Sequence, residues 1–294
     1  SMGRPKTPPP LPHHLRLEPF VQTDRAFALS AVASAPWSPL FAIASPKQVL
    51  LYHADSLDLL GILPYPEGFI ESLSFSRSGK LILASGGKGG KSGIVAAWQV
   101  ETGERGLTSG NEQDSILTAS ISPDQSLVAI GGTSKLVKVF DLASGEVLYQ
   151  IKKHSEWVTQ VSFSPDGILL ATADRTGGLH IWDAGTGNPF YSLLGHKAEI
   201  TDLSWRTDGN VLLSSSEDGG IRTWEMINGK SVKTWTAHSG GTLSAHFDEK
   251  GKVVSSGRDK TVKLWDENGK SIRTISGFKD IVMETRLSHD GTKV

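Results

Sequence analysis

The sequence predicts an all-β protein built from repeated units of four short antiparallel strands. A short segment that precedes a turn, clearest as Phe163-Ser164-Pro165, recurs along the 294 residues of the chain. Between the copies, apolar and polar residues alternate with a period of two, which is typical of strands that bury one face. The chain also contains 32 glycines and 14 prolines, and these residues form the turns that short strands need.

The recurring segment has a nearly constant spacing of about 40 residues. The middle residues of its copies are Ser38, Ser76, Ser122, Ser164, Arg206, Asp248 and Ser288. A second marker begins with an aromatic residue and follows the first six copies at Tyr52, Trp98, Phe140, Trp182, Trp224 and Trp265. Such a period indicates a repeat architecture, in which each unit buries its faces against its neighbours.

The unit around Trp182 shows how four strands arise. Residues 168–173 and 179–182 are alternating strands separated by the turn 175–178. After Trp182, the turn 184–187 leads into a further strand. Together with the strand that precedes Ser164, this arrangement predicts four antiparallel strands and no helix in each unit.

With these motifs the chain resembles the WD40 repeat family, over about residues 26–294 and most clearly in residues 154–196. The family folds as a β-propeller, in which four-stranded blades surround a channel. The resemblance implies a seven-bladed propeller over residues 15–294 whose last blade is incomplete. The blades are expected to start near residues 26, 66, 112, 154, 196, 238 and 278.

The expected seventh blade begins at Phe278, and its first strand reaches about Leu287. Residues 15–21 are expected to complete this blade from the N-terminal side. Strand material is still missing, so either the ring stays open or the natural chain continues past Val294, which is what we expect. An open strand edge favours self-association through the incomplete blade.

The resemblance also implies structural roles for three histidines. In the family, a His, a Ser or Thr, an Asp and the repeat Trp of one blade form a hydrogen-bonded chain, which gives the buried indole a partner. The matching residues are His196, Ser214, Asp218 and Trp224 in blade five, His238, Ser255, Asp259 and Trp265 in blade six, and His154, Thr172 and Trp182 in blade four. In blade four, Thr176 stands at the Asp position, and blade three has none of the four residues. Blades one to three are therefore expected to depend on packing and to open more easily.

Partner binding is expected on loops, because a propeller is a rigid scaffold that presents them. The candidates are Phe69, Trp157, Glu199 and Ile281 just before first strands, Arg175 and Arg258 in adjacent turns, and Lys88 and Lys91. Tryptophan is enriched in interface hot spots, although Trp157 has the alternative of folding over its own blade. Arg175 beside it would hold a carboxylate of a bound peptide.

Several other kinds of site are disfavoured. Residues 85–92 (SGGKGGKS) resemble a phosphate-binding loop, but they lead into a strand and not into the helix whose free N–H groups bind phosphate. They are interpreted as a glycine-rich turn. The nine histidines are scattered and cysteine is absent, so no catalytic residue, metal or cofactor is expected. The net charge of −1 argues against nucleic acid, and no apolar run reaches membrane-spanning length.

Residues 1–14 are expected to lie outside the propeller. Ser1-Met2 is interpreted as a cloning scar, and the Pro-rich residues 3–14 as an extended linker. Lys6, Pro9 and Pro12 fit a KxxPxxP pattern for Src-homology-3-type domains, but such patterns are common in linkers, and the linker interpretation is favoured.

The expected function is a non-catalytic scaffold that binds a protein or peptide through its loop face. An enzymatic or small-ligand propeller is less favoured, because innermost strands such as 158–163 and 200–205 are apolar and small. Another alternative is a structural module of a larger bacterial protein. The Pro-rich start, the QVLLY unit and the GGKGGKSG loop resemble proteins in which a WD40 propeller follows a c-type-cytochrome-like domain. That resemblance implies a periplasmic or exported location, and without it a cytoplasmic location is expected; the sequence alone does not fix the compartment.

Overall fold

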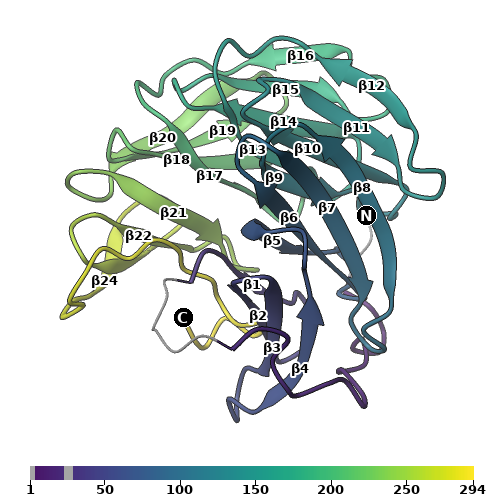
Figure 1. Cartoon of the computed structure of the whole chain (residues 1–294). Coiled ribbons are helices and arrows are strands. Elements are labelled where there is room, and N and C mark those ends of the chain that lie inside the picture. Colours follow the sequence, from purple (N-terminus) through teal and green to yellow (C-terminus); the bar gives the residue numbers. More distant parts are fainter. Residues whose placement is uncertain (1–3, 23–28) are drawn as a thin grey trace.

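A computed structural model describes residues 4–22 and 29–294. The described chain forms six antiparallel sheets of four strands each, which follow one another around a ring as blades (Figure 1). The predicted four-stranded all-β blades are present, but the described residues form six blades, so the prediction of seven is wrong. The expected start of the first blade near residue 26 lies outside the described residues.

The strands of each blade are consecutive in sequence. Blade one contains β1 (Val32–Ser34), β2 (Leu40–Ser45), β3 (Gln48–His53) and β4 (Leu59–Pro64). Blade two contains β5 (Phe69–Phe75), β6 (Leu81–Lys88), β7 (Ser92–Gln99) and β8 (Arg105–Glu112). Blade three contains β9 (Ile116–Ile121), β10 (Leu127–Gly132), β11 (Val137–Asp141) and β12 (Val147–Ile151).

The second half of the ring repeats this order. Blade four contains β13 (Val158–Phe163), β14 (Leu169–Asp174), β15 (Leu179–Asp183) and β16 (Pro189–Ser192). Blade five contains β17 (Ile200–Trp205), β18 (Val211–Ser216), β19 (Gly220–Glu225) and β20 (Lys230–Thr236). Blade six contains β21 (Thr242–Phe247), β22 (Val253–Gly257), β23 (Val262–Trp265) and β24 (Ser271–Ile275).

Burial differs between strands because of their place in the blade. All residues of β14 are buried, whereas most residues of the outer strand β20 are exposed. The second strand of a blade lies between two neighbouring blades, so both its faces favour apolar or small residues. The pairing of the third and fourth strands shifts register beside the aromatic marker in every blade. This recurring bulge adds local twist to the outer strand.

Residues 276–294 contain no strand, so the first strand expected near 278–287 is absent. Side chains hold this segment between β21 and β1 instead. The backbone N–H of Thr285 donates to Ser244 Oγ (3.4 Å), and the Val32 N–H donates to Glu284 Oε2 (2.8 Å). A strand persists only when its backbone groups pair along another strand, and the residues after Leu287 form a turn closed by Gly291 and Ser288.

The N-terminal segment lies against blades one and two. The expected strand at 15–21 is absent, and the Arg16 carbonyl accepts a hydrogen bond from the Ile62 N–H of β4 (2.9 Å). Earlier in the sequence, the His13 N–H donates to the Glu101 carbonyl (2.9 Å), and Leu15 packs on the hydrophobic core of blades one and two. The expected completion of a seventh blade by this segment is therefore wrong. Pro9 and Pro12 are buried.

Candidate functional site on the loop face

One face of the ring is formed by the links that precede each first strand and by the turns between second and third strands, and we call it the loop face. In blades four, five and six, these two kinds of connection are joined by a backbone hydrogen bond. Arg175 N donates to Trp157 O (3.0 Å), Glu217 N to Glu199 O (2.9 Å) and Arg258 N to Gly241 O (3.1 Å). The candidate residues on links and turns are therefore held at fixed positions by backbone geometry.

Trp157 is partly open to solvent and carries an arginine on its ring. Its exposed fraction is 39 %, and the guanidinium carbon of Arg175 lies 4.4 Å from the ring centroid. This is a cation–π contact. Arg175 forms no ion pair with a carboxylate in the described part of the chain. The pair thus presents an aromatic surface and an available guanidinium side by side.

A charged group continues this surface across blades five and six. Arg258 donates two hydrogen bonds to Glu217, at 2.8 and 2.6 Å. The pair lies over Gly241, whose φ of +135° is a backbone conformation that residues with a Cβ rarely adopt, so a glycine is favoured there. Burial and the nearby Glu217 carboxylate raise the pKa of Glu199, while Arg175 and Arg258 oppose this shift. The structure therefore brings Trp157, Arg175, Glu199 and Arg258 into one array.

The other candidates stand apart from this array. Phe69 begins β5 with an exposed fraction of 49 %, and Ile281 is half-buried in the C-terminal segment. Lys88 and Lys91 are exposed at the tip of the β6–β7 hairpin. The glycine-rich turn predicted at residues 85–92 is shorter than expected, because residues 85–88 and Ser92 are paired in the two strands and only residues 89–91 lie between them. Among the described residues, no side-chain hydrogen bond or ion pair joins these four to Trp157 or Arg258.

Hydrogen-bonded chains run behind the loop face in blades five and six. In blade five, Trp224 Nε1 donates to Ser214 Oγ (2.8 Å), which lies 2.8 Å from His196 Nε2. His196 Nδ1 lies 2.9 Å from Asp218 Oδ2. A carboxylate only accepts, so Nδ1 carries the proton and Nε2 accepts from the hydroxyl. Burial lowers the pKa of His196, which keeps the imidazole neutral in this chain.

Blade six repeats the same geometry. Trp265 Nε1 donates to Ser255 Oγ (2.8 Å), Ser255 Oγ lies 2.7 Å from His238 Nε2, and His238 Nδ1 lies 2.7 Å from Asp259 Oδ1. The pKa of Asp259 is lowered to about 2: burial alone would raise it, and the hydrogen bonds from His238 and Thr261 outweigh that effect. Each buried polar group of this hydrogen-bonded chain in blade six thus has a partner.

Blade four obtains its carboxylate from a residue that the sequence analysis did not select. Thr172 Oγ1 accepts from Trp182 Nε1 (2.8 Å) and lies 2.8 Å from His154 Nε2. Asp174 at the end of β14, and not the residue at position 176, lies 2.7 Å from His154 Nδ1. Thr176 instead donates its N–H and hydroxyl to Asp174 Oδ1. The sequence signal was the Asp two residues after Thr172, which a fixed repeat offset overlooks.

The comparison with protein families agrees with this geometry. The family model described as WD domain, G-beta repeat matches residues 145–183, 187–225 and 229–266. The chain is a WD40-repeat β-propeller. Each matched range of the WD40 propeller starts with the outer strand of one blade and continues through three strands of the next, as β12 precedes β13–β15. Proteins of this family commonly act as interaction scaffolds and are typically not enzymes. A comparison with curated proteins gives no match.

The central channel of the WD40 propeller contains charged residues that the sequence analysis missed. A hollow of about 410 Å³ is lined by residues of all six first strands and of the C-terminal segment. There, Asp202 Oδ2 lies 2.6 Å from His246 Nε2 and 3.5 Å from Arg286 Nη1. Arg286 also pairs with Glu284, whose pKa is raised by burial. The prediction of apolar and small innermost strands is therefore wrong at Asp202 and His246.

Two other kinds of site were sought among the described residues. No group of three or more His, Asp or Glu side chains is arranged as metal ligands would be in residues 4–22 and 29–294. The same residues include no helix whose length and apolar character would allow it to cross a membrane.

Proposed function

We propose that this WD40 propeller is a non-catalytic scaffold that binds a protein or peptide at the loop face around Trp157 and Arg175. The observation that carries the proposal is the exposed Trp157 ring with an arginine on it that has no carboxylate partner among the described residues. Trp and Arg are the residue types most enriched in interface hot spots. A partner carboxylate would complete the ion pair of Arg175 in a bidentate geometry.

Two features support the non-catalytic part of the proposal. The hydroxyls of Thr172, Ser214 and Ser255 belong to residues with no exposed surface, and each already accepts an indole N–H. In the channel, Ser244 Oγ donates to Asp202 (2.9 Å) and not to an imidazole. A serine nucleophile needs a base on its hydroxyl and must also be open to a substrate. The three blade hydroxyls have a histidine but are fully buried, and Ser244 in the channel has a carboxylate and no imidazole on its hydroxyl.

Affinity capture from a lysate of the source organism tests the proposal. The wild-type propeller is compared with the double variant Trp157→Ala, Arg175→Glu. A matched control carries Phe190→Ala and Lys250→Glu, which also removes an exposed aromatic ring and reverses one charge, but away from the loop face. We expect a protein that the wild type and the control retain and that the loop-face variant loses.

Equal retention by all three proteins would place the interaction elsewhere on the ring and overturn the proposal. Capture of nothing by the wild type would instead favour the alternative, in which the propeller is a structural module whose partner is another part of its own protein.

A further inference from the structure

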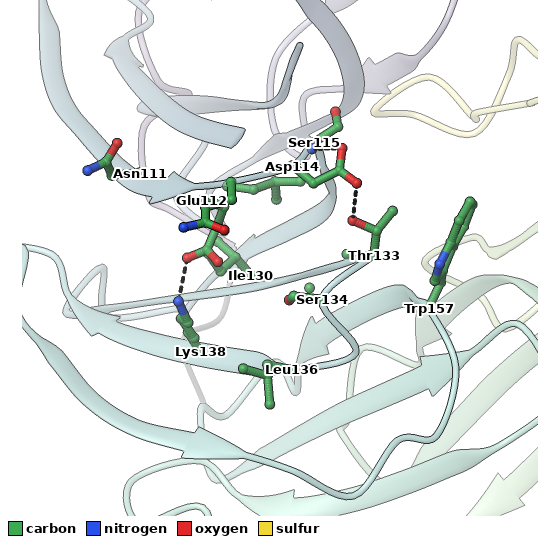
Figure 2. Close-up of a pocket in the computed structure, with 14 residues that line it drawn as sticks. Asn111, Glu112, Asp114, Ser115, Ile130, Thr133, Ser134, Leu136, Lys138 and Trp157 are labelled. Carbon is green, nitrogen blue, oxygen red and sulfur yellow. Dashed lines mark hydrogen bonds and ion pairs between the residues drawn. The ribbon is translucent and has the colours of Figure 1, made fainter. Parts of the chain in front are cut away.

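A pocket opens on the loop face between blades two and three (Figure 2). Its volume is about 610 Å³, and it is lined by residues 111–116, residues 130–134 with Leu136 and Lys138, and Trp157 of blade four. Glu112, Ile130 and Ser134 stand where blades five and six have the His, the hydroxyl and the Asp of the hydrogen-bonded chain. Blade three therefore leaves open a space that this chain fills in blades five and six.

The walls combine apolar surface with two separate carboxylates. Ile130 and Leu136 supply apolar surface. On one side, Glu112 pairs with Lys138 (2.7 Å). On the other side, Asp114 accepts hydrogen bonds from Thr133 Oγ1 (2.8 Å) and from the N–H groups of Gly90 and Ser115 (both 2.7 Å). These bonds lower the pKa of Asp114, so its carboxylate is ionised at neutral pH.

The charge of this pocket is not balanced. Lys138 is engaged by Glu112, and no Lys, Arg or His of the described chain forms an ion pair with Asp114. A further carboxylate lies nearby, because Ser115 Oγ donates to Glu71 Oε1 (3.4 Å). The Asp114 carboxylate raises the pKa of Glu71, and burial raises it more. The pocket therefore favours a cation.

Trp157 forms the remaining wall. Figure 2 shows its ring standing across the pocket from Asp114 and Thr133. Arg175 lies over the ring but does not line the pocket. The side of Trp157 that borders the pocket is thus available for a second flat or cationic group.

We propose that this pocket binds a lysine or arginine side chain of the partner. The aliphatic stem lies along Ile130, Leu136 and Trp157, and the charged head group pairs with Asp114. Long basic side chains combine these two properties, an apolar stem and a cationic end. The inference rests on the proposed function of the loop face, and it adds that the partner places a basic residue beside the acidic group that Arg175 holds.

The test uses a small probe and no partner. N-acetyl-lysine methylamide and N-acetyl-arginine methylamide are titrated into the ¹⁵N-labelled protein, and the indole signal of Trp157 and the amide signals of Thr133 and Ser134 are followed by NMR. We expect saturable shifts with both probes and none with the uncharged norleucine analogue. Asp114→Asn should weaken binding by about tenfold or more, whereas Asp208→Asn on the opposite face should not.

A second variant keeps the test decisive if Asp114→Asn disturbs the fold. Ser134 is exposed and borders the pocket, so Ser134→Lys places an ammonium there and should abolish probe binding. Equal shifts with the norleucine analogue, no shifts with either basic probe, or unchanged binding by Ser134→Lys would overturn the proposal. Because no partner is present, failure here is distinct from failure of the capture experiment.

Discussion

Blades four to six and blades one to three differ in how they accommodate the buried aromatic residue of the repeat. In blades four, five and six, the repeat Trp donates its N–H to a hydroxyl that is itself tied to a His–Asp pair. In blade two, Trp98 has no exposed surface, yet its Nε1 has no hydrogen-bond partner among the described residues. Blade three removes the donor, because Phe140 replaces the Trp. In blades four to six the aromatic residue is held by hydrogen bonds, whereas in blades two and three it is held by apolar packing.

The register explains why Trp98 lacks a partner. Ile82 pairs with Trp98 as Leu212 pairs with Trp224 in blade five. Two residues further along, Ala84 therefore stands where blade five has Ser214. An unpaired buried donor costs about 1–3 kcal/mol, so the surrounding apolar contacts of blade two must offset that cost. The comparison teaches that one repeat geometry tolerates both solutions when neighbouring blades supply packing.

The largest expected effect comes from removing the centre of one hydrogen-bonded chain. Ser255→Ala leaves both the Trp265 indole and His238 Nε2 without a partner, and we expect a loss of about 3 kcal/mol in the free energy of unfolding. Ser256→Ala is the matched control, because Ser256 is equally buried but its hydroxyl has no partner in the described chain. Urea denaturation measures both. Equal effects of the two changes would contradict the role of the chain.

A decrease in pH should destabilise blades four to six more than blades one to three. The pKa of His180 is lowered to about 4 from 6.5, mainly by burial, and the pKa values of His196 and His238 are also lowered. Below pH 6.5 the unfolded chain then binds more protons than the folded one, so stability falls as the pH decreases. A further fall should follow as the pH drops from 3.8 towards about 2, where Asp259 is protonated.

Hydrogen exchange measured by mass spectrometry tests, blade by blade, whether blades one to three open more easily than the blades with hydrogen-bonded chains. At pH 7.5 we expect slower exchange in β17–β24 than in β1–β12 after correction for intrinsic rates. At pH 5.5 the difference should narrow, because histidine protonation affects the second half of the ring. Strands of blades one to three serve as the internal control in each experiment. Slower exchange in blades one to three at pH 7.5 would refute the comparison.

The smallest expected effect is a gain in stability from a substitution in blade two. Ala84→Ser places a hydroxyl opposite the unpaired Trp98 N–H, and we expect about 1 kcal/mol of additional stability. In a Trp98→Phe background the same change should give no gain, because no indole N–H remains. Thermal and urea unfolding of the four proteins form a double-mutant cycle. A gain that persists without the indole would show that the hydroxyl acts through another contact.

Local patterns predicted much of the fold. The period-two alternation and the aromatic markers predicted four-stranded units, because side chains on a strand alternate between faces. The offset from Ser214 to Trp224 recurs from Ser255 to Trp265, so the paired groups of blades five and six were visible in the sequence. Asp174 was missed because the carboxylate reaches His154 from a different position of the same turn, and a fixed offset does not describe that side-chain path.

The sequence by itself determined the strands within the six blades, the four-stranded unit and the family, because each depends on residues close together in the chain. Only the tertiary structure decided the number of blades, the course of both terminal segments and the charged cluster in the channel. Those features depend on contacts between distant residues, such as Val32 with Glu284 and Asp202 with Arg286. A strand forms only when a partner edge is present, and the residues around Glu284 bond instead through side chains that no local pattern specifies.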